Sequence, residues 1–245
     1  MEQEFLQFVK RTIPTPEILL YFTLPLLLYG MGAAWLSGFL KTRYAWRTAY
    51  TRKVFHFVIF TAAGILQLVW SLKVVVLFGV LVSGIVLYGV WRGKGHPFYE
   101  SLARTKDAPK RSLFILIPLA TTAAGGILAN ILFPPFAYIG YLAGGWGDAV
   151  GEPVGSRWGK HPYKVPSLGG IPATRTLEGS AAVFAMSFLV VLAALLVQNF
   201  SLELAVYTAL ACAAGGTATE AISHHGLDNL TMQIAASGIV YWILG

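Results

Sequence analysis

Long apolar segments constrain the fold of this chain more than any other feature. They occupy residues 17–40, 54–72, 74–91, 112–133, 134–150, 180–198, 202–220 and 229–244. Apolar runs of about 18 residues are typical of membrane-spanning helices, which need about 20 residues to cross the hydrocarbon core. Only 12% of the residues are charged, against about 25% in average soluble proteins. The pattern predicts an all-α protein, a polytopic transmembrane helix bundle of about eight spans.

Charge distribution supports eight spans over the alternative of seven. Fifteen of the eighteen Lys and Arg residues lie in the loops 41–53, 92–111 and 151–179. With eight spans, all three loops lie on one side of the membrane, and basic loops mark the cytoplasmic side. The last two segments are short and contain Gly, Thr and Ser, which is why seven spans stays the alternative. The net charge of +7 therefore indicates topology and anionic ligands, and we expect no nucleic-acid partner.

Three further expectations concern the organisation of the chain. Residues 1–16 mix Phe and Val with charges and predict an interfacial amphipathic segment, followed by a single transmembrane catalytic domain over 17–245. The loop 92–111 either contacts phosphate headgroups or only sets topology, and we favour the second interpretation. The segment 112–133 contains glycines that allow a helix to pack closely against a second copy, so a homodimer is expected as well.

The stretch GGWGDAVGEPVGSRWGKHPYK, residues 144–164, places carboxylates at the end of an apolar segment. Asp148 and Glu152 are four residues apart and would share one face of a helix. The glycines Gly147, Gly151 and Gly155 would line a stripe that lets another backbone approach closely. Pro153 leaves a second interpretation open, in which the helix breaks and a new N-terminus faces an anion. Carboxylates at such a place suit Mg²⁺, completed by water and phosphate oxygens.

Cations follow these carboxylates. They are Lys160, Lys164 and Arg175, the last within TRTLEGS, which also contains Glu178. Cations near carboxylates and a hard metal ion are typical of a site for a nucleoside triphosphate. A solvated basic loop is the alternative interpretation. GSRWGKH lacks the spacing of a P-loop, so a P-loop nucleotide fold is excluded.

Two more polar clusters border apolar segments. YTRKVFHF places Arg52 and Lys53 at the start of a segment, with His56 about one turn deeper. TEAISHHGLDNLTM places Asp228 and Asn229 at the start of the final segment. Asp228 suits either a metal site or an N-cap of the last helix. The adjacent His224 and His225 in this stretch do not have the spacing of a zinc site.

RKVFHF, GDAVGEPVGSRWGKH, TRTLEGS and GLDNLT together resemble, in order, the motifs of the CTP-dependent lipid-alcohol kinases. That family includes dolichol and phytol kinases and is related to the phosphatidate cytidylyltransferases. The resemblance covers roughly residues 50–235. Where the family has Lys-Lys-Thr, this chain has Thr174-Arg175-Thr176. The longer Asp-Arg-x-x-Asp signature of the cytidylyltransferases is absent, which favours a kinase.

The resemblance implies transfer of the CTP γ-phosphate to the hydroxyl of a membrane lipid alcohol, such as a polyprenol, phytol or geranylgeraniol, with release of CDP. It implies that Asp148, Glu152 and Asp228 bind Mg²⁺, and that Asp148 or His56 accepts the hydroxyl proton. The implied nucleotide-binding residues are Arg52, Lys53, Gly147, Gly151, Gly155, Lys160, Lys164, Arg175, Glu178 and Asn229. In this scheme Glu178 orients Arg175 or the metal waters.

Two alternatives stay open. A phosphatidate cytidylyltransferase would act on a lipid phosphate and release pyrophosphate. A non-catalytic transporter would use the carboxylates as an ion path, but transport residues usually lie near the bilayer midplane. Here the charged residues lie at the ends of the apolar segments.

Overall fold

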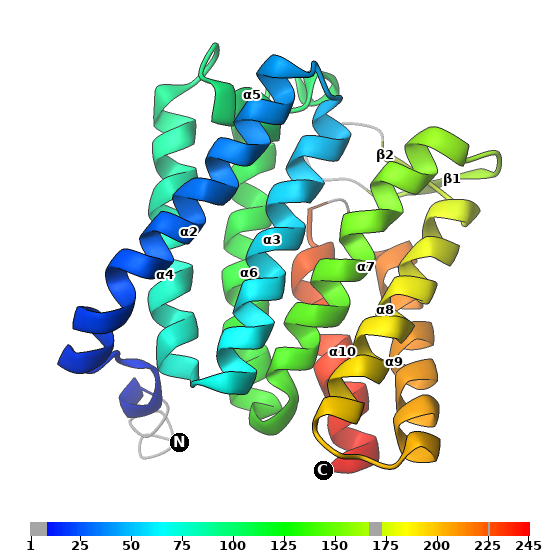
Figure 1. Ribbon diagram of the computed structural model, residues 1–245. Coiled ribbons are helices and arrows are strands. Elements are labelled where there is room, and N and C mark those ends of the chain that lie inside the picture. The colour runs from blue at the N-terminus through cyan, green and yellow to red at the C-terminus, as the bar shows by residue number, and fades with distance from the viewer. Residues whose placement is uncertain (1–8, 167–172, 225) are drawn as a thin grey trace.

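The computed structural model describes residues 9–166, 173–224 and 226–245, and in this part the chain is a bundle of long helices (Figure 1). They are α2 (Pro16–Arg43), α3 (Thr48–Val69), α4 (Leu72–Arg92), α6 (Leu113–Leu132), α7 (Ala137–Trp158), α8 (Leu177–Val197), α9 (Leu202–Ile222) and α10 (Asp228–Leu244). Each expected apolar segment corresponds to one of these helices. The all-α bundle is therefore confirmed.

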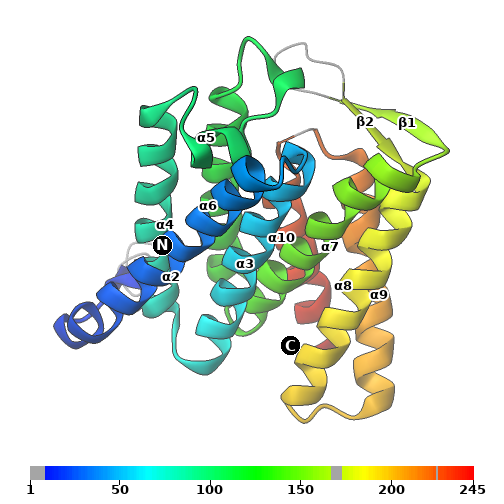
Figure 2. The same cartoon turned by 45° about the horizontal axis from the view of Figure 1, so that its top comes forward.

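Short elements gather at one end of the bundle. They are α5 (Pro97–Leu102), the 3₁₀ turn η1 (Thr105–Asp107) and an antiparallel hairpin of β1 (Pro162–Val165) and β2 (Ala173–Thr176). Figures 1 and 2 show α5 and the hairpin at the same end, beside the C-terminus of α2 and the N-terminus of α3. The 3₁₀ turn η2 (Pro134–Phe136) joins α6 to α7 at the opposite end. The three basic loops thus share one end, as their charge predicts.

Five helices in the described part of the chain are long and apolar enough to cross a membrane, namely α2, α3, α4, α6 and α8. The count of eight spans is not confirmed. Helix α10 has only 17 residues, and carboxylates and glycines lower the hydropathy of α7. Every residue of α7 from 137 to 149 except Trp146 is buried. A helix enclosed by other helices need not be apolar, because protein rather than lipid surrounds it.

Helix α7 joins the two halves of the hydrophobic core. One core cluster draws mainly on α2 to α5 and includes Tyr141 of α7, while the other lies among α7, α8, α9 and α10. Its contacts with α3, α8 and α10 place α7 at the centre of the bundle. Residues on its inner face therefore reach both halves of the protein.

The glycine stripe predicted on α7 packs against α8. A Cβ atom at Gly147 would lie 2.5 Å from Ser187 Oγ, and one at Gly151 would lie 2.6 Å from Val183 Cγ2. Only glycine permits this approach, since real Cβ atoms do not come so close to other heavy atoms. Helix α7 continues through Pro153 to Trp158. Of the two interpretations of this stretch, the unbroken helix is therefore correct.

The predicted N-terminal segment falls mostly outside the described residues, which begin at residue 9. Residues 9–12 are helical, and Thr15 caps α2 by accepting a hydrogen bond from the backbone N–H of Ile18. The interfacial location of residues 1–16 and the homodimer both stay predictions.

Candidate active site

Two cavities adjoin at the end of the bundle that carries α5 and the hairpin. The polar cavity has a volume of about 540 Å³ and is bordered by α3, the 104–106 segment, α7, β2 and the α9–α10 junction. The apolar cavity has a volume of about 120 Å³ and lies between α3, α4 and α6. Four charged residues line both cavities, namely Arg52, Lys53, Asp148 and Asp228. These four residues separate the polar cavity from the apolar cavity, and all four were predicted from the sequence to belong to the site.

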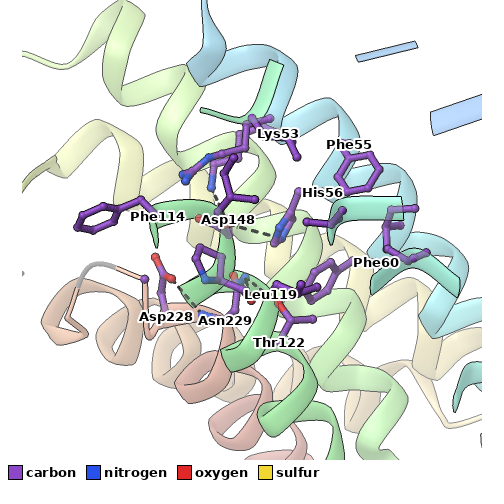
Figure 3. Close-up of a pocket in the computed structure, with 18 residues that line it drawn as sticks. Lys53, Phe55, His56, Phe60, Phe114, Leu119, Thr122, Asp148, Asp228 and Asn229 are labelled. Carbon is purple, nitrogen blue, oxygen red and sulfur yellow. Dashed lines mark hydrogen bonds and ion pairs between the residues drawn. The ribbon is translucent and has the colours of Figure 1, made fainter. Parts of the chain in front are cut away.

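Asp148 lies between two side chains of α3 (Figure 3). Lys53 Nζ is 2.5 Å from Asp148 Oδ2, and His56 Nε2 is 3.5 Å from the same oxygen. The three-residue spacing of Lys53 and His56 puts both on the side of α3 that faces α7. The His56 ring stacks on Phe60 with centroids 4.1 Å apart. Nε2 of His56 is buried and has no hydrogen-bond partner among the described residues, so it is available to a hydroxyl that enters the apolar cavity.

Glu152 lies one turn further along α7 and is surrounded by cations. Arg52 Nη2 lies 2.7 Å from Glu152 Oε2, and Arg104 Nη1 lies 3.2 Å from Oε1. Lys53 Nζ is 3.7 Å from Oε2. Both oxygens of Glu152 therefore form ion pairs with arginine, and the role of this carboxylate is to position Arg52 and Arg104. The predicted metal contact of Glu152 receives no support from this geometry.

Arg175 of β2 joins the ends of α9 and α10. Its Nη2 lies 2.9 Å from Asp228 Oδ2, and its Nε lies 2.6 Å from Glu220 Oε1. It also donates to the backbone carbonyls of Glu220 and Ser223. The other oxygen of Glu220, Oε2, is buried without a hydrogen-bond partner among the described residues. One guanidinium thus fixes two carboxylates at the edge of the polar cavity.

The chain is similar in sequence to a known phytol kinase. The chain is 28% identical over 217 residues to the phytol kinase of Synechocystis sp.. The aligned region covers 86% of this chain and 87% of the relative. This similarity supports the resemblance to lipid-alcohol kinases that the motifs indicate. No protein-family profile matches it, and no solved structure matches it. The likeness to cytidylyltransferases stays a prediction.

The structure brings together most, but not all, of the residues that the resemblance to lipid-alcohol kinases implies. Gly151 and Gly155 line the polar cavity, whereas Gly147 is covered by α8. Asn229 lines the apolar cavity and donates to Thr122 Oγ1 at 2.9 Å. Lys160 precedes the hairpin and Lys164 lies in β1; both are exposed and line neither cavity. Their contact with a nucleotide stays a prediction.

Glu178 differs from its predicted contact. Its Oε1 lies 2.7 Å from His161 Nδ1, and its Oε2 accepts a hydrogen bond from the backbone N–H of His161. It lines neither cavity. Because Glu178 is the second residue of α8, its carboxylate ties the start of the hairpin to that helix. The expected contact with Arg175 is not formed.

Several cavity residues were not predicted from the sequence. They are Lys41, Arg47, Arg104, Lys106 and Glu220. The first four lie in basic loops, where topology alone explains a lysine or arginine. The one available signal was their number, because seven cationic side chains line the cavity against four acidic ones. An excess of positive charge in a cavity favours a polyanionic ligand.

The carboxylates fit a magnesium ion that shares its coordination with phosphate. Within the described ranges, no three His, Cys, Asp or Glu residues form a metal-binding group. Mg²⁺ usually requires only one or two protein carboxylates when waters and phosphate oxygens supply the remaining ligands. Asp148 and Asp228 line the same cavity, and the unpartnered oxygen of Glu220 borders it. This donor set suits a hard cation that takes its other ligands from water and phosphate oxygens.

Proposed function

We propose that the protein transfers the γ-phosphate of CTP to the hydroxyl group of a membrane lipid alcohol. One observation carries the proposal: Asp148 and its partner Lys53 stand in the wall shared by the cationic cavity and the apolar cavity. A nucleoside triphosphate suits the first cavity and an alkyl chain the second. The relationship to a phytol kinase supports a lipid alcohol as acceptor, while the choice of CTP rests on the resemblance in motifs.

The acceptor oxygen forms a bond to the γ-phosphorus while the bond from that phosphorus to the β–γ bridging oxygen breaks. The hydroxyl proton goes to Nε2 of His56, which has no hydrogen-bond partner among the described residues, or to Asp148. The negative charge that develops on the diphosphate is neutralised by cations of the polar cavity. Because phosphoryl transfer depends mainly on positioning and charge, neither group has to be a strong base.

Asp148 and Asp228 would hold Mg²⁺, which would supply positive charge against the phosphates. Glu152 has another task, because it orients Arg52 and Arg104 toward the cavity. Arg175 holds Asp228 and Glu220 in place. In this scheme the acids and the cations of the site position one another before any ligand arrives.

The apolar cavity receives the hydroxyl end of the alcohol. Its wall includes Phe55, Ile59, Phe60, Val82, Leu119 and Thr122. A volume of about 120 Å³ equals that of about four water molecules. It therefore holds only the first carbons of the acceptor, and the rest of the tail must extend along the helices into the bilayer. A single branched chain suits this space better than a glycerol with two acyl chains.

Isotope position tests the reaction class. Protein in detergent with Mg²⁺, phytol or geranylgeraniol, and phosphatidate as the acceptor that a cytidylyltransferase needs, receives CTP labelled at either the α or the γ phosphorus. We expect the lipid to be labelled from the γ position only, and expect no transfer when EDTA removes the metal. Label from the α position would indicate a cytidylyltransferase. No label from either position, across a panel that includes longer polyprenols, would contradict an enzyme of either class.

A bulky side chain in the apolar cavity tests the acceptor site. Leu119 projects toward His56 and Phe60 (Figure 3). Leu119→Trp should raise the KM for the alcohol about tenfold, because the ring occupies space needed by the chain, while the KM for CTP stays unchanged. Leu128→Trp, at an exposed position of the same helix, serves as the control. Equal changes in the two KM values would show that the cavity does not hold the acceptor.

The end of the bundle that carries the site is proposed to face the cytoplasm. The basic loops lie at this end, and short connections without comparable charge lie at the other. In this orientation CTP enters from water, while the lipid hydroxyl reaches Asp148 from within the membrane.

A further inference from the structure

The segment from Ala103 to Arg111, here the 103–111 loop, borders the polar cavity although none of its residues belongs to a recognised motif. Arg104, Thr105 and Lys106 line that cavity directly. The sequence favoured a purely topological role for this basic stretch. Its contacts in the folded chain point to a different role.

A buried ion pair holds the start of the loop. Arg104 donates from Nε to Asp107 Oδ2 at 2.7 Å and from Nη2 to Asp107 Oδ1 at 3.0 Å. Only 5% of Arg104 and 2% of Asp107 are exposed. Buried charges need this kind of two-fold contact, since desolvation otherwise outweighs their attraction. The third contact of Arg104, to Glu152, connects the loop to α7.

A second set of contacts holds the end of the loop. Arg111 Nη2 lies 2.7 Å from Glu100 Oε2 of α5, and the same guanidinium donates to the carbonyls of Ala103 and Arg104. The Arg111 guanidinium lowers the pKa of the Glu100 carboxyl by hydrogen bonding to it. The segment between these anchors is thus presented to the cavity in a defined conformation.

Three cations of the cavity form no ion pair among the described residues, namely Lys41, which donates to the backbone carbonyl of Trp46, and Lys106 and Arg47. Arg52, Lys53, Arg104 and Arg175 each pair with a carboxylate. Lys106 and Arg47 also line the cavity, but neither forms an ion pair within the described parts of the chain. Both are exposed to the space that they border. Unpaired cations in a cavity that is already rich in positive charge are suited to an anionic ligand.

We infer that Lys106 and Arg47 bind the polyphosphate of the nucleotide, and that Asp107 positions Lys106 through Arg104. This inference rests on the proposed function for the identity of the nucleotide. Lys106 lies in the 103–111 loop, and Arg47 is the residue that precedes α3. The phosphates would then be held from the side of this loop as well as by the residues of α3 and β2.

Direct binding tests the two cations. Purified full-length protein in detergent is dialysed against CTP, CDP or cytidine, for the wild type, Lys106→Ala, Arg47→Ala and the control Lys94→Ala. Lys94 is exposed in the preceding loop and lines neither cavity. We expect each cavity variant to weaken CTP binding about tenfold, the loss of one charge-assisted contact. Cytidine binding should be unchanged, and Lys94→Ala should resemble the wild type.

The outcomes separate the inference from the proposed function. If Lys106→Ala and Arg47→Ala bind CTP as tightly as the wild type, the inference is wrong even when γ-phosphate transfer is observed. If the wild type binds CTP and both variants bind it more weakly, but the wild type transfers no phosphate, the inference stands and the proposed reaction fails. If the wild type binds no CTP or CDP, both fail.

The positioning role of Asp107 has its own test. Asp107→Asn removes the charge that holds Arg104, so we expect the KM for CTP to rise about fivefold while the KM for the alcohol and kcat stay within twofold. Asp107→Glu, which keeps the charge, should recover part of the loss. A uniform decrease in activity that follows thermal stability, with no change in either KM, would indicate a structural role only.

Discussion

Asp148→Asn should reduce γ-phosphate transfer by a factor on the order of 10³, the loss expected when a main electrostatic group of a reaction centre is removed. Asn keeps the shape of the side chain but loses the charge that pairs with Lys53 and that would bind Mg²⁺. The protein should still fold, because Lys53 Nζ also lies 3.7 Å from Glu152 Oε2 and retains a counter-charge. Initial rates at saturating CTP and alcohol, together with thermal unfolding in detergent, measure both effects.

Glu203→Gln is the matched control for Asp148→Asn. Glu203 lies exposed in the first turn of α9, at the opposite end of the bundle from the site. Replacing this carboxylate by an amide should leave the rate within twofold of the wild type. If Asp148→Asn also retained near-normal activity, Asp148 would have no part in metal binding or proton transfer.

Arg175→Met should have the largest effect on stability. It leaves Asp228 and Glu220 without their shared cation in a largely buried place, where the side chains are 13% and 8% exposed. Removing one partner from a buried ion pair typically costs about 3–5 kcal/mol. Transfer should fall as well, because Asp228 loses the contact that positions it. The unfolding midpoint and the initial rate of transfer in detergent measure the two losses.

Arg175→Lys and Arg157→Met complete this experiment. Lysine keeps the charge but lacks the fork that reaches both carboxylates, so an intermediate loss is expected. Arg157 is exposed near the end of α7 and stacks on Trp158, so its replacement should change stability little. A wild-type unfolding midpoint for Arg175→Met would show that the two carboxylates do not depend on Arg175.

The pattern of apolar segments predicted the helices of the fold closely, and the places where the structure differs from that prediction have local causes. Beyond the apolar segment 134–150, the sequence left a continuous helix and a break at Pro153 both open, and α7 continues to Trp158. Pro153 does not end the helix, because the glycine face of this stretch packs against α8 over its whole length. The hairpin of β1 and β2 was not predicted, since four-residue strands carry too few residues for an alternating pattern to be recognised.

The candidate site was only partly accessible from sequence. Lys53, His56 and Asp148 stood out because charges at the ends of apolar helices are costly and therefore informative. Lys106 and Arg47 did not, because a basic residue in a basic loop has an ordinary explanation in topology. Glu220 belongs to the polar stretch TEAISHHGLDNLTM, but no role was predicted for it, and its contact with Arg175 appears only in the folded chain. Residues that converge from separate elements leave no pattern in the linear chain.

The sequence by itself determined that the chain forms a helical bundle with apolar faces and collects its charge at one end, because burial of apolar helices and the position of cations are properties of local composition. Only the tertiary structure decided which charges neutralise one another. Glu152 is occupied by Arg52 and Arg104, whereas Lys106 stays available to a ligand. Pairing depends on distances of a few ångströms between helices, and these are set by side-chain packing across α3, α7 and the loops rather than by the order of residues within any one of them.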